Sequence, residues 1–215
     1  MSNFEYIISS LPFLTTDYKY ADGQGFGTVL EEIKDNLGEK DTEALAFLLD
    51  GFNPQKLGAD FYALALKSPN RFIREYFRFD LNLRNAKVRY LNRVLERPED
   101  QDVLTGKGTE NEEGLDIDGY RFTGGEFEED AKVQNALESA SLLDREKALD
   151  DITWDKIDSL ETFHYFDLTA VLAYVAKLHI VDRWLALDEA KGRELFHKLV
   201  QEVKGTFKGV NYPEK

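Results

Sequence analysis

Two Glu-x-x-His pairs have the clearest metal-binding spacing in the sequence: Glu161 with His164, and Glu194 with His197. Helix bundles that bind two metal ions through carboxylates use this spacing, but both pairs must then face the interior of the bundle. Glu194 and His197 lie on the helix face opposite an apolar stripe, so we expect this pair to face solvent. The stripe is formed by Leu195, Phe196, Leu199, Val200 and Val203. The sequence therefore predicts no metal site.

Two glycine-rich stretches resemble ligand-binding loops but lack the required spacing. The stretch DGQGFG (22–27) has glycines at alternate positions, which matches neither the dinucleotide fingerprint nor the P-loop. The stretch GLDIDG (114–119) suggests a calcium loop. With Gly119 in the sixth position, however, the first and twelfth ligands would be Gly114 and Gly125, which have no carboxylate. We expect a plain turn in the first case, no EF-hand in the second, and no bound cofactor.

Nucleophilic and acid–base catalysis also have no recognisable residue pattern here. The chain has no cysteine, which excludes thiolate catalysis, disulfides and cysteine-ligated metals. No serine nucleophile elbow occurs. His179 lies beside the apolar face of its own predicted helix, where we expect it to be packed or capped. The sequence thus predicts no catalytic residue and a protein that is not an enzyme. An enzyme with an unrecognised carboxylate site stays the alternative, and a deep pocket with converging acids would favour it.

The net charge and hydropathy limit the classes of partner. The chain has 41 acidic against 27 basic residues, a formal net charge of -14, which repels a nucleic-acid backbone. No stretch approaches the roughly 18 apolar residues of a membrane span, and the N-terminus does not have the pattern of a signal peptide. We expect a cytoplasmic protein with no nucleic-acid partner and no direct membrane insertion, whose membrane association is peripheral and occurs through a complex.

Positive charge is nevertheless concentrated in one stretch, from residue 71 to residue 97, where eight bases occur with three acids. Arg74, Arg78, Arg89 and Arg93 fall on one face of a predicted helix, here called the basic face. A solvated helix surface explains this pattern, and so does a surface that binds an acidic protein. Flanking basic elements typical of nucleic-acid binding are missing. We therefore predict that this face meets an acidic protein surface, or this chain's own acidic loop.

The elements that position these residues are predicted to be helices. Apolar residues recur at helical spacing, sustained strand alternation is absent, and residues 1–27 are ambiguous. The longest helix has Ser68 as its cap and Pro69 in its first turn, and it meets no proline or glycine before Pro98, so roughly 28 residues, or about 42 Å, run unbroken. Capping and stop signals predict further helices over 28–37, 41–50, 58–66, 126–143, from a cap at Asp144 past 161, over 160–187 and over 188–204.

These signals together predict an all-α fold: one domain over 1–215, built as an elongated bundle of long antiparallel helices. Residues 98–125 are the exception, because they contain six glycines and eight acids and favour a loop or insertion.

The long helix has an apolar arc wider than one neighbour could cover, so we expect it to pack on two sides. Asp80, Arg84 and Lys87 fall inside this arc. Asp80 and Arg84 have the four-residue spacing of an ion pair. The remaining cation requires an acid from elsewhere, and Asp167 lies on the apolar face of the 160–187 helix. We therefore predict a contact between Asp167 and Lys87 or Arg84.

Two stretches resemble the central-stalk component of V/A-type rotary ATPases, which is called C in prokaryotic and d in eukaryotic enzymes. They are EYFRFDLNLRNAKVRYLNRVLER (75–97) and FDLTAVLAYVAKLHIVDRWLALDEAKGRELF (166–196). The likeness is an acid followed by Asn and a basic residue in a long helix, and later an aliphatic-Ala-Tyr stretch. The opening NFEYIISSLPFL (3–14) resembles a bacterial family of uncharacterised proteins associated with V-type ATPase gene clusters.

The resemblance implies a non-catalytic protein of the central stalk that couples the central shaft to the membrane rotor ring in proton or other ion transport. Its fold would be similar to part of the C/d fold of V/A-type ATPases, because the chain is shorter than those proteins. Residues matching the motif would be architectural: Asp80, Asn82, Arg84, Tyr174 and Asp182. The alternative function is a free-standing helical protein–protein adaptor that uses the acidic 98–125 segment.

Overall fold

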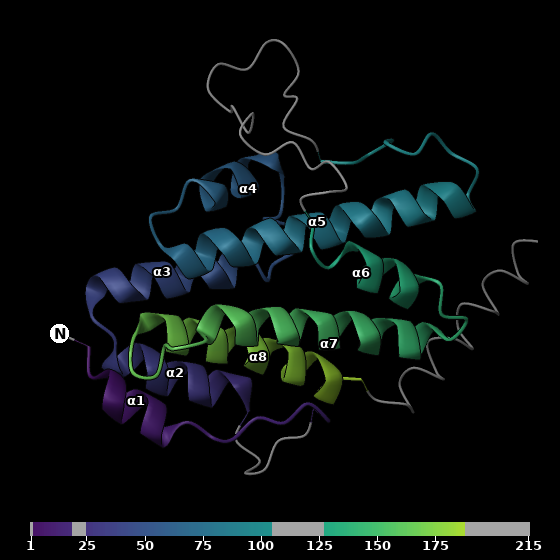
Figure 1. Ribbon diagram of the computed structural model, residues 1–215. Coiled ribbons are helices and arrows are strands. Elements are labelled where there is room, and N and C mark those ends of the chain that lie inside the picture. The colour runs from purple at the N-terminus through teal and green to yellow at the C-terminus, as the bar shows by residue number, and fades with distance from the viewer. Residues whose placement is uncertain (1, 19–24, 105–126, 188–215) are drawn as a thin grey trace, which may run out of the picture.

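All the regular elements in the described part of the chain are helices. The computed structural model describes residues 2–18, 25–104 and 127–187, and these contain eight helices and no strand (Figure 1). The helices are α1 (Phe4–Ser10), α2 (Phe26–Asn36), α3 (Glu39–Asp50), α4 (Ala59–Leu66), α5 (Arg71–Val94), α6 (Asp130–Leu137), α7 (Leu142–Glu161) and α8 (Leu168–Leu185). The all-α prediction is confirmed for these residues; the predicted helix at 188–204 lies outside them. None of the described helices is long and apolar enough to cross a membrane.

Side-chain caps fix where the long helices begin. The Asn70 side chain accepts a hydrogen bond from Ile73 N, which starts α5 two residues later than the predicted Ser68 cap. Ser141 caps α7 by accepting from the backbone N–H of Asp144, so the prediction of Asp144 as the cap is wrong. These caps satisfy backbone N–H groups that have no partner within the first helical turn. The resulting α5 has 24 residues, a length of about 36 Å.

The segment predicted as one helix from 160 to 187 is broken. α7 ends at Glu161, residues 162–167 form a loop, and α8 begins after Asp167, whose carboxylate accepts from Ala170 N. Phe163 has φ 70°, in the left-handed region that ends helices. α7 and α8 therefore form an antiparallel hairpin, visible in Figure 1.

The three long helices form the frame of the molecule. α5 runs antiparallel to α7, as the contacts of Lys87 with Glu146 and of Lys156 with the Phe79 ring require. α6 packs on both of them, and α4 packs on α5. α8 is the central element, since it contacts α1, α2, α3, α5 and α7. Nine of its residues are buried, as expected for a helix that is apolar on most of its circumference.

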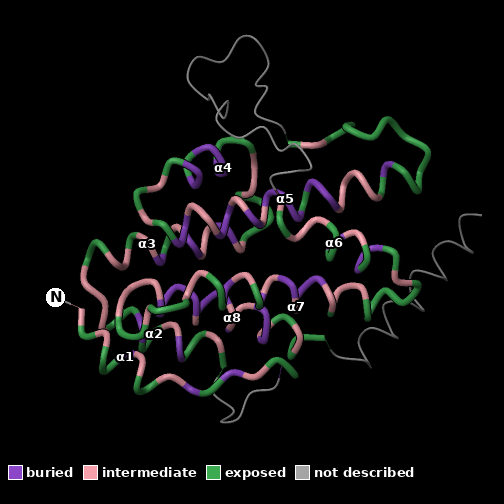
Figure 2. The backbone as a smooth tube through the Cα atoms, viewed as in Figure 1, coloured by how far each residue is buried: buried purple, intermediate pink, exposed green. Residues whose placement is uncertain are grey.

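Two apolar clusters form the core, and α5 contributes to both, which confirms that its wide arc packs on two sides. Buried positions recur along α5 in Figure 2. The larger cluster joins α5 to α8 and the N-terminal helices through Phe72, Ile73, Tyr76, Phe77 and Leu81. The smaller cluster joins α5 to α6 and α7 through Phe79, Leu83 and Ala86. The arc is not covered along its whole length, because Leu91, Val94 and Leu95 are exposed.

Candidate interaction surfaces

The basic face is present on α5, but its arginines contact other parts of the same chain. Arg74 donates to Ser68 O at 2.7 Å, and Arg78 forms an ion pair with Glu75 at 2.8 Å. Arg74, Arg78 and Arg89 are half-buried, and Arg93 is the exposed member of the set. The predicted docking of an acidic partner on this face stays a prediction. Its arginine side chains are less exposed than the sequence suggests.

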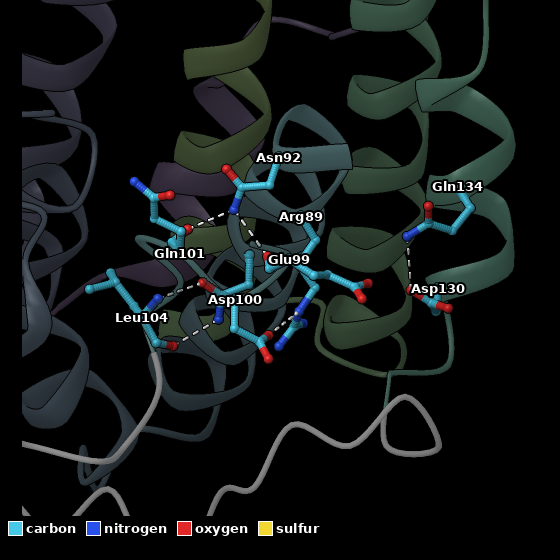
Figure 3. A network of polar contacts seen from close by, with 9 residues as sticks. Arg89, Asn92, Glu99, Asp100, Gln101, Leu104, Asp130 and Gln134 are labelled. Atoms are coloured by element: carbon cyan, nitrogen blue, oxygen red, sulfur yellow. Dashed lines mark hydrogen bonds and ion pairs between the residues drawn. The ribbon is translucent and has the colours of Figure 1, made fainter. Parts of the chain in front are cut away.

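Towards the C-terminal end of α5, the polar face binds the chain that follows the helix (Figure 3). Arg89 Nε contacts Asp100 Oδ1 at 3.2 Å. The Asn92 side chain donates to the backbone carbonyls of Glu99 at 3.0 Å and Gln101 at 2.7 Å. On the other side, Arg93 donates to Gln134 of α6 at 2.7 Å.

Asn85 completes this asparagine clamp, a name used here for Asn85 and Asn92. Its side chain accepts from Leu104 N at 3.0 Å and donates to Leu104 O at 2.9 Å, as a neighbouring β-strand would. Both asparagines are buried. Helical spacing puts Asn85 beside the arginines of the basic face, where a solvated side chain is expected, so its role was missed; the only signal was an uncharged amide among arginines. The clamp fixes residues 99–104, the start of the predicted 98–125 loop, most of which lies outside the described residues.

The predicted Asp80–Arg84 ion pair is present. Arg84 Nε lies 2.8 Å from Asp80 Oδ2, and the Tyr62 hydroxyl of α4 donates to the same oxygen at 2.5 Å. Burial and the charge of Asp80 raise the pKa of Tyr62, so its hydroxyl stays protonated and acts as a donor. Burial alone would lower the pKa of Arg84, but the charge and hydrogen bond of Asp80 outweigh it and the pKa rises. The network joins α4 to α5.

The predicted contact of Asp167 with Lys87 or Arg84 is wrong. Lys87 lies 3.5 Å from Glu146, whereas Asp167 caps α8 and contacts His164 Nδ1 at 2.5 Å. The physical reason is the break at 162–167, which places Asp167 beyond the far end of α7 from Glu146 (Figure 1).

A second acidic network, which the sequence did not indicate, joins α7 to α8. Asp150 is 6% exposed and accepts from Trp184 Nε1 at 2.7 Å and from the Arg183 guanidinium. The adjacent Asp151 accepts from the Tyr18 hydroxyl at 2.6 Å, and Tyr18 stacks on Trp184 with ring centroids 5.4 Å apart. These carboxylates hold helices and the N-terminal segment together.

The described histidines are engaged in packing and capping contacts. His179 stacks on Phe52, with ring centroids 4.1 Å apart, and burial together with the Arg183 charge lowers the pKa of His179 to about 4. Glu161, which has metal-binding spacing from His164, pairs with Lys177 at 2.5 Å. Within the described ranges there is no cluster of three or more potential metal ligands. The pair Glu194 and His197 lies outside those ranges.

One polar hollow of about 160 Å³ lies between α5 and α7, and its charged groups include two ion pairs. Arg78 pairs with Glu75, and Lys156 pairs with Glu129, both at 2.8 Å. The hollow is lined by Glu75, Arg78, Phe79, Asn82, Phe127, Glu128, Glu129 and Lys156.

The most distinctive surface feature is exposed apolar side chains at both ends of the bundle. Fourteen large hydrophobic side chains are exposed among the described residues, and ten of them belong to these two groups. The aromatic tip is the loop joining α7 to α8, with Phe163, Tyr165 and Phe166. The aliphatic end lies at the opposite end, where α5 and α8 finish and α7 begins (Figure 1), and comprises Leu91, Val94, Leu95, Leu142, Leu143, Leu185 and Leu187.

Ion pairs and backbone conformation describe the surroundings of both groups. In the half of the bundle that carries the aliphatic end, Lys87 of α5 contacts Glu146 of α7, and Arg183 of α8 contacts Asp150 of α7. At the aromatic tip, Phe163 holds a left-handed backbone conformation, which costs a bulky residue about 1–2 kcal/mol.

Comparison with known proteins gives one family match. A family model described as "Protein of unknown function (DUF2764)" matches residues 52–206. Neither the comparison with curated proteins nor that with solved structures gives a match.

Proposed function

We propose that this chain, which belongs to the DUF2764 family by a match over residues 52–206, is a non-catalytic coupling subunit of a V/A-type rotary ATPase. In this role it connects the central shaft to the membrane rotor ring at the cytoplasmic side of the membrane. Its partners are the other ATPase subunits, and it requires no cofactor of its own.

The observation that carries the proposal is the pair of apolar ends on a packed rod. The core consists of two apolar clusters that both include α5 and α7, while ten large hydrophobic side chains are exposed towards the two ends of the bundle. Clustered exposed apolar side chains are typical of protein-binding sites. A rod that binds one protein at each end can transmit force or torque between them, which is what a coupling subunit requires.

The polar groups of the interior support a structural rather than a chemical role. The Asp80 carboxylate accepts hydrogen bonds from Tyr62 of α4 and from Arg84 of its own helix. The Asp150 carboxylate accepts from Arg183 and Trp184 of α8. Each carboxylate therefore connects its helix to a neighbouring one. These links fit the architectural roles that the family resemblance implies for Asp80 and Arg84. Tyr174, from the same motif, donates to Pro12 O at 2.8 Å and so ties α8 to the N-terminal segment.

The experiment is affinity purification of the tagged chain from its native organism, followed by mass spectrometry. We expect rotary ATPase subunits to co-purify in fixed proportion. A tagged cytoplasmic protein of similar charge serves as the control. Purification of the chain free of ATPase subunits, under conditions that keep the ATPase assembled, would contradict the proposal.

The second candidate function is the free-standing helical adaptor. The asparagine clamp favours it, because Asn85 and Asn92 fix the start of the acidic 98–125 segment and so present that segment at a defined place. Deleting residues 106–124 separates the two functions. An adaptor would lose its partners in the same purification, whereas the coupling subunit would keep contacts made through the ends of the bundle.

A further inference from the structure

We propose that the aromatic tip, with the hollow beside it, is the docking site for a protein segment that presents an apolar side chain between lysines or arginines. This inference rests on the proposed function in one respect, that the chain binds a protein partner, and it names the surface and the chemistry of that partner.

The first argument is the conformation of Phe163. Its side chain is 84% exposed and its φ is 70°. A phenylalanine in this conformation is strained, and a glycine would adopt it without strain. Because so exposed a side chain gains little from packing in this structure, packing of the ring supplies no compensation for the strain. Contact with a partner would supply it, and aromatic side chains are frequent among the residues that dominate binding energy.

The second argument is that the loop holds its aromatics in place. Thr162 N donates to Asp158 O at 3.0 Å, and His164 N donates to Glu161 O at 2.8 Å. His164 Nδ1 also contacts the Asp167 carboxylate that caps α8. A surface whose backbone is fixed before binding loses less entropy when it binds.

The third argument is a concave surface next to the tip. Phe166 lines an open hollow of about 430 Å³ with four residues from the start of the chain: Ser2, Asn3, Phe4 and Glu5. The hollow is shallow and wide open to solvent, so a side chain of a partner can reach it from the surface. The tip therefore combines projecting rings with a recess, the arrangement of an interface anchor.

The charge around the tip specifies the partner. Lys177 is 14% exposed and pairs with Asp158 at 2.6 Å and Glu161 at 2.5 Å, so one buried cation faces two carboxylates. Asp167 adds a third carboxylate, and the exposed Glu5 borders the hollow. This excess of negative charge attracts lysines and arginines and repels an anionic membrane. It also disfavours a second copy, because a twofold contact would bring the same acidic surfaces together.

The test uses two synthetic helical peptides, one of leucine and lysine and one of leucine and glutamate at the same spacing, titrated into the full chain. The decisive variant is Phe163→Gly, which leaves the net charge unchanged, so non-specific attraction to the acidic chain stays constant. The control is the double variant Leu142→Ser and Leu143→Ser at the aliphatic end.

We expect the lysine peptide to bind the wild type, to bind Phe163→Gly at least tenfold more weakly, and to bind the control variant as it binds the wild type. The urea midpoint of Phe163→Gly should be unchanged or higher, because glycine relieves the strain. Equal affinity for wild type and Phe163→Gly would overturn the inference. So would binding of the glutamate peptide, binding to anionic vesicles that Phe163→Gly abolishes, or a wild-type dimer that this variant dissociates.

The same variant separates this inference from the proposed function. If wild type and Phe163→Gly co-purify equally with ATPase subunits, the docking site is wrong, whereas the association with the ATPase stands. If the wild type co-purifies with none of them while peptide binding still depends on Phe163, the function is wrong and the docking site stands.

Discussion

Replacing Asn85 by alanine tests the asparagine clamp. The variant loses the hydrogen bonds of 3.0 Å and 2.9 Å to Leu104 N and O, at a position that is 2% exposed. Each bond contributes about 1 kcal/mol, and the space left by the amide adds to the cost. We expect the free energy of unfolding to fall by about 2–3 kcal/mol, a large fraction of the roughly 5–15 kcal/mol of a typical domain.

The assay is urea unfolding followed by far-ultraviolet circular dichroism, with amide hydrogen exchange at Leu104. The matched control is Asn36→Ala, which also removes a side-chain bond to a backbone carbonyl, Glu32 O at 2.8 Å, but at a more accessible position. We expect that control to change stability by less than about 0.5 kcal/mol. The reasoning is refuted if Asn85→Ala matches the control, or if the Leu104 amide exchanges equally fast in the wild type and in Asn85→Ala.

Three further predictions concern the core. In Gly51→Ala, the new Cβ would lie 2.2 Å from Cζ of the buried Phe77 ring, so urea unfolding should show a loss of about 1–3 kcal/mol; wild-type stability would mean that the ring can move. The pKa of His179 is lowered from 6.5 to about 4 by burial, so between these pH values the unfolded chain binds a proton that the folded chain does not. The free energy of unfolding therefore decreases as pH falls from 6.5 to 4, by up to about 1.4 kcal/mol per pH unit. His179→Gln should remove this component, and equal pH slopes for variant and wild type would contradict it. Asp150→Ala removes the acceptor of Trp184 Nε1 and should lower the free energy of unfolding by about 2–4 kcal/mol. Asp150→Asn retains an acceptor and should cost less. Thermal unfolding compares the two variants, and equal losses would show that the hydrogen bond to Trp184 does not contribute to stability.

The sequence predicted the features that depend on local spacing. The wide apolar arc of α5 follows from helical periodicity, and residues 72–86 are packed on two sides as expected. The Asp80–Arg84 pair depends only on a four-residue separation within one helix. Both predictions hold because neighbours along a helix surface are fixed by the backbone alone.

The break at 162–167 was missed because that stretch contains neither glycine nor proline. A left-handed Phe163 has no sequence signal of its own. A cap signal was nevertheless present: Asp167 precedes the apolar run of α8, and aspartate is a favoured N-cap. Interpreting it as a cap would have predicted the hairpin and removed the false contact with Lys87.

The asparagine clamp and the Asp150 network could not be predicted from the sequence, for a different reason. Asn92 binds backbone carbonyls of a loop, which no side-chain pattern identifies. Asp150 meets Trp184 across 34 positions of sequence, a pairing that depends on how α7 and α8 align. Polar residues on such helices are normally solvated, so their burial becomes evident only once the neighbouring elements are placed.

The central claim is that the bundle connects two proteins, one at each of its apolar ends. The most direct measurement is a cryo-electron microscopy reconstruction of the assembly purified through the tagged chain. The account predicts density for one subunit against the aromatic tip and for a different subunit against the aliphatic end. A reconstruction in which both ends are open to solvent would contradict it.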